Sequence, residues 1–454
     1  MRTLTRALIQ QRMMCAGIIL STALFSPLPG PLFAQDFGFG GGEDPAVSGE
    51  DPGGWTGSGG APSAAINGEI SAVMIGYIND FSEGTNHVRL GDIFSGKLNL
   101  SASASFAEGV VKLRVNPSSR LPEAGPILFD EAYLRAYFGK FDIEAGLRKL
   151  TWGKADSFGP LDVINPLDTT AIYPEMADSS DLMDVKIPRP LIHASWRAGE
   201  FSKLEGVFVP TFQPHLIASS GRWAQAQAEM LSLASAPDTT TFQYAQAGLR
   251  FTTTLGASDL GVQYYYGRLP QPAVQISRFG ANLLYNFYHQ IGLDYAQVIA
   301  GFNIRAELAA NLTKDWEGDD GSVYNPALAW SLGFDRDLFL GVNLNVQATE
   351  TIRLMNDAVG SSDPMSGNFD IEAGKDSTAT RIMAILSRKF LRDELELRAA
   401  VVWDVEEQDF AIMPAVVWTK DAVTVACSGG VFGGDKAGQL GQYHDNNFVK
   451  IGVT

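Results

Sequence analysis

Cysteine, histidine and recognisable catalytic motifs are scarce in this sequence. Its two cysteines are Cys15 and Cys427, and Cys15 lies in a segment with the features of an export signal. Once that segment is removed, no intrachain disulfide is possible, so stability must come from strand pairing and burial. The five histidines are scattered, with no H-E-x-x-H pair, no Cys/His metal spacing and no G-x-S-x-G elbow. The sequence therefore predicts no catalytic residues, no metal site, no cofactor and no enzymatic activity.

Positive charge is also scarce. The chain has 34 Lys and Arg residues against 51 Asp and Glu residues, a formal net charge of −17. Phosphate binding needs clustered Lys and Arg, so nucleic acid is excluded as a partner. An acidic surface suits an extracellular face or a pore mouth that attracts cations.

Long hydrophobic runs are absent apart from one near the N-terminus. Residues 13–25 form a mainly apolar run that follows Arg2, Arg6 and Arg12, and Ala34 ends a breaker-rich segment. This pattern predicts a cleaved signal peptide over residues 1–34. An uncleaved anchor helix is the competing interpretation, but the run is short for a bilayer span. The lack of a second helical run excludes a helical inner-membrane bundle.

Residues 35–63 are rich in Gly, Pro and acidic residues and have no hydrophobic periodicity. We expect a flexible leader here rather than a domain. The GFGGG within it has no strand before it and no helix after it, so it does not predict a phosphate-binding loop.

What the sequence does have is alternation of polar and apolar residues, which begins near Ala64 and continues to the end. It is clearest in residues 300–313, where Phe302, Ile304 and Leu308 alternate with Asn303, Arg305 and Glu307. Side chains in a strand point to opposite faces with period 2, so such strands separate an apolar phase from a wet one. The pattern predicts an all-β fold, a transmembrane antiparallel β-barrel of about 16 strands (range 14–18) over residues 64–454, in a bacterial outer membrane.

Charged residues recur on the polar faces of these strands. They are Lys112, Arg114, Arg135, Glu144, Arg148, Arg305, Glu307, Glu396 and Arg398. Charges that face a barrel lumen normally pair across strands. Two interpretations stay open: an ion-pair lattice that stiffens the wall, or a transverse field that orients solutes at a constriction.

Residues 153–186 are too long for a turn and hold seven acidic residues against two lysines. Asp156, Asp162 and Asp168 are the candidate site residues among them. Long loops tend to carry function, and Pro160, Pro166 and Pro174 restrict the path of this one. We expect the loop to fold into the barrel and narrow it, presenting carboxylates to the pore. An acidic loop on the outer surface is the alternative.

Two segments resemble a known family. Residues 130–168 combine E-A-Y-L, G-x-R-K-x-x-W-G and I-N-P-x-D, and residues 289–313 hold an I-G … A-E-L pair of strands. Both are similar to a poorly characterised, porin-like family of Gram-negative outer-membrane β-barrels. The resemblance implies a channel or solute-uptake barrel, sometimes suspected of handling hydrophobic compounds. Its signature positions, none with an established role, are Arg148, Trp152, Gly153, Asn165, Pro166 and Asp168.

The chain departs from many outer-membrane barrels at its C-terminus. Those barrels end in an aromatic residue that the barrel-assembly machinery reads, whereas this chain ends in Val453 and Thr454. The alternation of the last strand survives, so we expect that machinery and outer-membrane lipid to be partners, with a variant assembly signal.

Together these features predict a passive diffusion channel for small solutes. One alternative is an uptake channel for long-chain lipids, with the apolar segments 283–288 and 230–234 lining a surface-facing groove. A surface adhesin built on a barrel is a further alternative. A barrel hydrolase is the weakest, because such enzymes use a His with a Ser or Asp, and neither His193 nor His289 has an evident nucleophile at a telling spacing.

Overall fold

The computed structural model describes residues 62–82, 94–115, 127–157, 159–170, 172–177, 182–225, 231–277, 280–360 and 370–454. The predicted signal peptide and all but the end of the predicted leader lie outside these residues.

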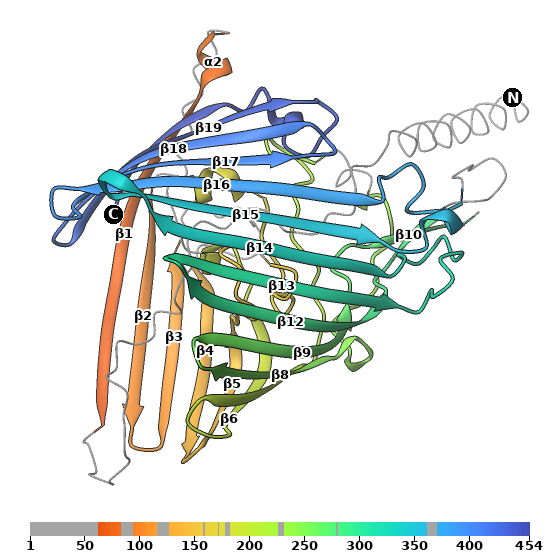
Figure 1. The fold of residues 1–454 in the computed structure, drawn as a ribbon, viewed down its shortest axis with the longest axis horizontal. Coiled ribbons are helices and arrows are strands. Elements are labelled where there is room, and N and C mark those ends of the chain that lie inside the picture. Colours follow the sequence, from red (N-terminus) through yellow and green to blue (C-terminus); the bar gives the residue numbers. More distant parts are fainter. Residues whose placement is uncertain are drawn as a thin grey trace, which may run out of the picture.

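An antiparallel sheet of 18 strands closes on itself to form a barrel (Figure 1). Its first half consists of β1 (Ser63–Tyr77), β2 (Phe94–Ala104), β3 (Ala107–Val115), β4 (Ile127–Phe138), β5 (Phe141–Arg148), β6 (Arg189–Arg197), β7 (Ser202–Val209), β8 (Gln246–Leu255) and β9 (Ser258–Arg268). Its second half consists of β12 (Phe287–Ile299), β13 (Phe302–Thr313), β14 (Ala327–Asp337), β15 (Val342–Arg353), β16 (Thr378–Phe390), β17 (Leu395–Asp404), β18 (Asp409–Lys420), β19 (Val423–Gly434) and β20 (Phe448–Val453). A separate hairpin of β10 (Ala273–Ser277) and β11 (Gly280–Leu284) lies in the loop between β9 and β12.

The strand count of 18 corrects the expected value of about 16 and falls at the upper end of the predicted range. Alternation is weakest in β16 to β19, because several inner-face positions there are apolar, including Met383, Val402 and Met413. Strands that are apolar on both faces lose the period-2 signal on which the count depended.

Two ends of the barrel differ in their connections. Short turns join β2 to β3, β4 to β5, β8 to β9, β12 to β13 and β18 to β19, and both the start of β1 and the end of β20 lie at this turn end. Most connections at the opposite, loop end are long. In outer-membrane barrels short turns face the periplasm and long loops face outwards.

The barrel closes between its first and last strands. β1 pairs with β2 over Ser63 to Ala72, and with β20 from Ala72↔Val453 to Tyr77↔Phe448. β20 is therefore long enough to cover only the loop-end part of β1. Backbone hydrogen bonds join Thr454 to Thr424 in both directions, so the chain terminus is itself paired to β19.

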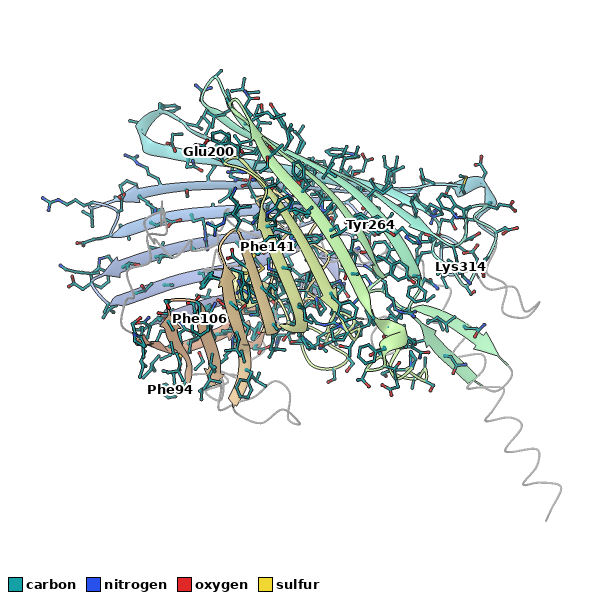
Figure 2. All side chains as sticks on the ribbon, turned by 90° about the horizontal axis from the view of Figure 1, so that it is seen from below. Phe94, Phe106, Phe141, Glu200, Tyr264 and Lys314 are labelled. Carbon is teal, nitrogen blue, oxygen red and sulfur yellow. The ribbon has the colours of Figure 1, made fainter. Side chains whose placement is uncertain are left out.

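The outer face of the wall is mainly apolar. Large hydrophobic side chains such as Leu249, Ile291 and Leu308 are 57%, 52% and 46% exposed. Figure 2 shows the side chains along this wall, with Phe141 and Tyr264 labelled on it. A closed barrel with a continuous apolar exterior satisfies every backbone group internally and presents hydrocarbon to lipid. The protein is thus built as an integral membrane β-barrel. No helix in the described ranges is long and apolar enough to cross a bilayer.

Loop segments occupy part of the interior (Figure 1). The short helix α3 (Ile172–Met176) packs with Trp223 and Tyr443 against the inner faces of β16 to β20. A second cluster places Trp152 and Ile164 against Val207 and Tyr265. The interior therefore has apolar contacts of its own, which fix the long loops against the wall.

Candidate functional site

Residues 149–188, here called the lumen loop, connect β5 to β6. Asn165 joins the two ends of this loop. Its Oδ1 accepts a hydrogen bond from the Leu150 amide at 2.8 Å, and its Nδ2 donates to the carbonyls of Arg148 (3.1 Å) and Ile187 (2.9 Å). The amide of Ile187 also donates to the Pro166 carbonyl at 2.8 Å. The I-N-P segment is therefore a clasp, and an amide is needed because the position must accept and donate at once.

Trp152 and Gly153 begin the inward course of the loop. Trp152 is 3% exposed and packs in the cluster with Val207 and Tyr265. Gly153 has φ +106°, and a Cβ there would collide with the Glu307 carboxylate. Only glycine allows both this conformation and the close approach of the backbone to Glu307.

The wall opposite provides hydrogen-bond partners for the loop backbone. Glu307 on β13 accepts from the amides of Lys154, Ala155 (2.7 Å) and Leu161 (3.3 Å). Three glutamines on other strands also bind the loop. Gln263 donates to the Leu161 carbonyl and Gln290 to the Pro160 carbonyl, both at 2.9 Å. Gln347 accepts from the Ser157 amide and donates to the Ser157 hydroxyl. A buried loop must find such partners for its backbone groups.

Two predicted pore carboxylates are buried in ion pairs. Asp156 is 1% exposed and pairs with Arg305, which also pairs with Asp335 at 2.8 Å. The Asp162 carboxylate lies 2.7 Å from Lys186. Burial raises the pKa of Asp162, and the neighbouring Lys186 ammonium opposes that rise. The expectation that these carboxylates face the pore does not match this geometry, because both are buried in ion pairs, Asp156 with an arginine that it shares with Asp335.

Asp168 has a local role. Its Oδ1 accepts from the amide (3.0 Å) and hydroxyl (2.6 Å) of Thr170. Asp184, near the other end of the loop, pairs with Lys97 at 2.9 Å and Arg114 at 3.0 Å. Asp178 and Asp181 lie outside the described residues.

The predicted charges on β3 to β5 form a connected lattice. Its centre is Glu131, 1% exposed, which pairs with Lys112 at 2.5 Å and Arg148 at 2.9 Å. Glu144 in turn pairs with Arg148 at 2.9 Å and Arg135 at 2.5 Å. Lys112 with Glu131, and Arg135 with Glu144, are directly opposite in the strand register, where cross-strand pairs are strongest.

The lattice continues through His193, whose ring nitrogens lie 3.5 Å from Glu144 and 3.3 Å from Glu205. The two later charge pairs behave differently. Arg305 and Glu307 each bind the lumen loop, and Arg398 donates to the Ala177 carbonyl at 3.2 Å, whereas Glu396 is half-buried on the same inner face. Arg305, Glu307 and Arg398 therefore contact the lumen loop.

The apolar segment expected to line a surface groove is buried instead. Leu283, Tyr285 and Tyr288 are 8%, 7% and 2% exposed, and Tyr285 packs with Phe212 and Tyr244. In the second segment Met230 lies outside the described residues, and Leu233 is 69% exposed.

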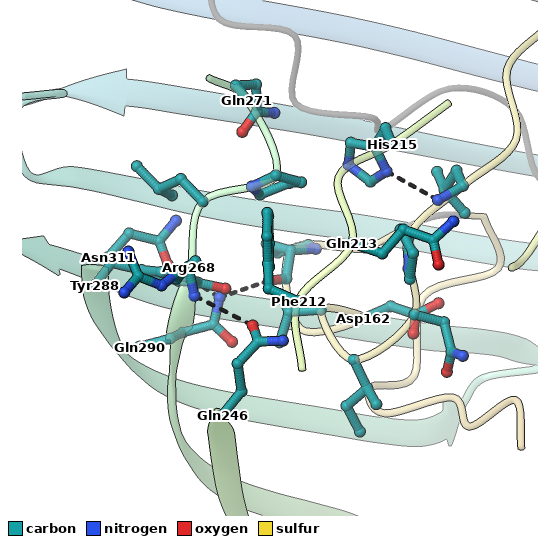
Figure 3. Close-up of a pocket in the computed structure, with 18 of the residues that line it drawn as sticks. Asp162, Phe212, Gln213, His215, Gln246, Arg268, Gln271, Tyr288, Gln290 and Asn311 are labelled. Carbon is teal, nitrogen blue, oxygen red and sulfur yellow. Dashed lines mark hydrogen bonds between the residues drawn. The ribbon is translucent and has the colours of Figure 1, made fainter. Parts of the chain in front are cut away.

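A cavity of about 80 Å³ lies between the lumen loop, residues 212–215 and the loop ends of β8, β9 and β12 (Figure 3). Its lining includes Asp162, Arg189, His215, Arg268 and Gln271. The Leu167 amide donates to His215 Nδ1 at 2.8 Å, so the neutral ring carries its proton on Nε2. Burial lowers the pKa of His215 to about 4, which keeps the ring neutral.

Sequence reasoning missed several of these residues. Glu131 shares its strand face with Tyr133 and Arg135, so alternation would have placed it on the same lumen face as Lys112. Arg250 and Asp294, 2.7 Å apart, are a further buried pair on strand faces. The glutamines that hold the loop carry no such signal, because they bind backbone rather than other side chains.

No family model matches the chain, and no curated protein matches it. Solved outer-membrane barrels are similar in structure. The outer membrane protein Wzi of Escherichia coli, described as a carbohydrate-binding β-barrel, has 10% identity and a TM-score of 0.46 over 85% of this chain and 83% of that one. OccK9 of Pseudomonas aeruginosa has 9% identity and a TM-score of 0.47 over 86% and 97%. Salmonella typhi OmpF has 8% identity and a TM-score of 0.41 over 86% and 96%. Because these sequence identities and TM-scores are low, the function of this chain must be argued from its own residues.

Proposed function

We propose that the protein is a channel for passive diffusion of small solutes, narrowed by the lumen loop. The observation that carries the proposal is the difference between the two sides of the inner wall. Beneath the loop, Gln263, Gln290 and Gln347 are each 1% exposed. On the opposite side the side chains of Lys112, Arg114 and Arg135 keep 36%, 25% and 24% of their surface exposed.

This difference supports a water-filled path along β2 to β5. Lumen charges that reach water can pass small polar solutes and select them by width and wall charge, with no chemical step. The lumen loop sets the width of this path, because its backbone is held to β9, β12, β13 and β15 on the far side of the barrel. The signature positions Trp152, Gly153 and Asn165 then act by fixing the path of the loop.

Ion conductance of the purified protein in planar lipid bilayers tests this proposal. We expect stable open channels, and a larger single-channel conductance when residues 154–161 are replaced by two glycines. A point variant, Glu307→Gln, weakens the hold on three loop amides and should give frequent steps to the larger conductance.

Glu350→Gln is the matched control. Glu350 is on β15 and accepts from Trp330 Nε1 at 2.6 Å, on the outer side of the wall. The conductance of the Glu350→Gln variant should equal that of the unchanged protein. An unchanged conductance in the loop variant would overturn the constriction. Absence of any conductance, together with no sugar-driven swelling of liposomes, would overturn the channel itself.

A further inference from the structure

A column of stacked rings with one cation lies at the loop ends of β9 and β12. The Cζ of Arg268 is 3.5 Å from the ring centroid of Phe287 and 4.0 Å from that of Tyr244. Phe287 stacks on Tyr266 with centroids 5.2 Å apart, and Tyr266 lies 5.1 Å from the ring of His289. Arg268 is directly opposite Phe287 in the strand register. The next pair on the same face, Tyr266 and His289, is also directly opposite, so the column crosses two neighbouring strands.

The side chains of this column point away from the lumen, as the alternation along β9 shows. Gln263 and Tyr265 are 1% and 0% exposed on the inner face, whereas Tyr264 between them is 43% exposed on the outside of the wall (Figure 2). Tyr266 and Arg268 follow Tyr264 at intervals of two residues, so they share its face. The loop end of an outer-membrane barrel faces outwards, and aromatic and basic side chains there lie where the outer leaflet meets water.

Arg268 is a cation without a counter-charge. Its guanidinium donates to the carbonyls of Tyr285 (2.5 Å) and Gln243 (3.0 Å), which leaves further N–H groups for another acceptor. Within the described part of the chain, no carboxylate pairs with it. Arg222, also at the loop end, pairs instead with Asp80 at 2.7 Å. Because two rings and two carbonyls hold the Arg268 guanidinium, its charge has a fixed position at the membrane surface.

Apolar side chains continue from the column towards the turn end. Val262 on β9 is 48% exposed, and Ile291 and Leu293 on β12 are 52% and 49% exposed. Leu249 on the neighbouring β8 is 57% exposed. Such a surface favours contact with hydrocarbon chains. The fixed cation and the apolar strip beside it therefore match the two parts of a lipid whose headgroup carries a phosphate.

We propose that this face binds a phosphate-bearing lipid of the outer leaflet, with the phosphate at the Arg268 guanidinium and an acyl chain along Ile291 and Leu293. Phosphate oxygens accept the parallel N–H donors of a guanidinium, and such charged hydrogen bonds are roughly twice as strong as neutral ones. An anionic headgroup also supplies the counter-charge that Arg268 lacks. The site lies on the lipid side of the wall, so the proposal does not depend on the channel.

Native mass spectrometry of the full-length, detergent-solubilised protein tests the site, because it counts the lipids bound to the folded barrel. Dimyristoyl phosphatidic acid is the probe, and dimyristoylglycerol is the matched lipid that lacks only the phosphate. We expect saturable binding of phosphatidic acid, binding of dimyristoylglycerol at least tenfold weaker, and no binding of inorganic phosphate at the same concentrations. Equal binding of the two lipids, or no binding of phosphatidic acid, would overturn the phosphate site. Equal binding of inorganic phosphate and phosphatidic acid would overturn a lipid as its ligand.

Variants locate the site. Arg268→Gln should weaken the binding of phosphatidic acid roughly tenfold, because it removes the charged donor. His289→Glu should have a similar effect, since it adds a repelling carboxylate to the column without altering the carbonyls that hold Arg268. Arg197→Gln is the control, because Arg197 is also exposed but lies at the turn end and pairs with Asp142 at 3.9 Å. Heat-modifiable migration in detergent gels checks that each variant folds.

The comparison among these variants decides the assignment. Unchanged affinity in both Arg268→Gln and His289→Glu would show that phosphatidic acid binds elsewhere and would overturn the site. A loss in Arg197→Gln as large as that in Arg268→Gln would mean that the total charge of the protein, rather than this column, attracts the lipid. That result would also overturn the proposal.

Discussion

At the scale of single residues, Asn165 shows how one side chain can hold a long loop. It makes one accepted and two donated hydrogen bonds that join Arg148, Leu150 and Ile187. Asn165→Ala would leave a buried amide and two carbonyls without partners, at about 1–3 kcal/mol. We expect a lower urea midpoint for unfolding, followed by tryptophan fluorescence, and faster proteolysis within the lumen loop.

Asn343→Ala is the control for that change. Asn343 donates to Asp337 at 2.9 Å on an exposed part of the turn end. Its removal should leave the midpoint and the loop proteolysis unchanged. Equal effects of the two substitutions would mean that the clasp contributes nothing specific.

His215 gives a prediction about pH. Burial lowers its pKa to about 4 from the ordinary value of 6.5, so the unfolded chain binds more protons than the folded one between these values. Stability from this group is therefore full above about pH 6.5 and falls as the pH drops towards 4. His215→Asn keeps an acceptor for the Leu167 amide but does not titrate.

The measurement is the urea midpoint of both proteins from pH 7 to pH 4. Carboxylates titrate in both, so the readout is the difference between the two curves. The unchanged protein should lose stability more steeply than His215→Asn. Parallel curves would contradict a neutral, buried His215.

At the residue scale, part of the candidate site could be predicted from the sequence. Alternation placed Lys112, Arg135 and Glu144 on the lumen face, and the strand register then pairs Arg135 with Glu144 and Lys112 with Glu131. The buried state of Asp156 could not be predicted in this way. Its partner Arg305 is on a strand far along the chain, and loop-to-wall contacts have no periodicity to reveal them.

At the scale of elements, the ion-pair lattice joins three strands through one residue. Glu131 on β4 binds Lys112 on β3 and Arg148 at the end of β5. It also accepts from the Lys149 amide at 3.0 Å, where the lumen loop begins. Glu131→Gln would leave buried positive charge uncompensated, so we expect unfolding to become easier by about 3 kcal/mol in urea titrations.

Glu69→Gln is the matched control for the lattice. Glu69 pairs with Lys97 at 3.2 Å, but its side chain is 44% exposed. Exposed pairs contribute at most about 1 kcal/mol. A loss as large for Glu69→Gln as for Glu131→Gln would refute a special role for the lattice.

At the scale of the whole molecule, different strands of the inner wall have different roles, a division that follows from where the lumen loop lies. Neutral amides on β9, β12 and β15, together with the Glu307 carboxylate on β13, bind the lumen loop. Charged pairs occupy β3 to β5, where water reaches them. Sequence predicted the barrel and its polar lumen, because period 2 is a local signal. It could not predict this division, which depends on where a distant loop comes to rest.

Closure of the barrel gives the last prediction. Met74 on β1 is directly opposite Ile451 on β20, and both are exposed on the outer face at 44% and 45%. In a Cys427→Ser background, Met74→Cys with Ile451→Cys should form a disulfide on oxidation, because directly paired strand residues lie within disulfide reach. The boiled, cross-linked chain should migrate differently in a detergent gel, and reductant should reverse the shift. Ile66→Cys with Ile451→Cys should not cross-link, since Ile66 pairs with Leu100 and lies beyond the reach of β20. Cross-linking of that second pair with equal yield would mean that the strands close in a different register.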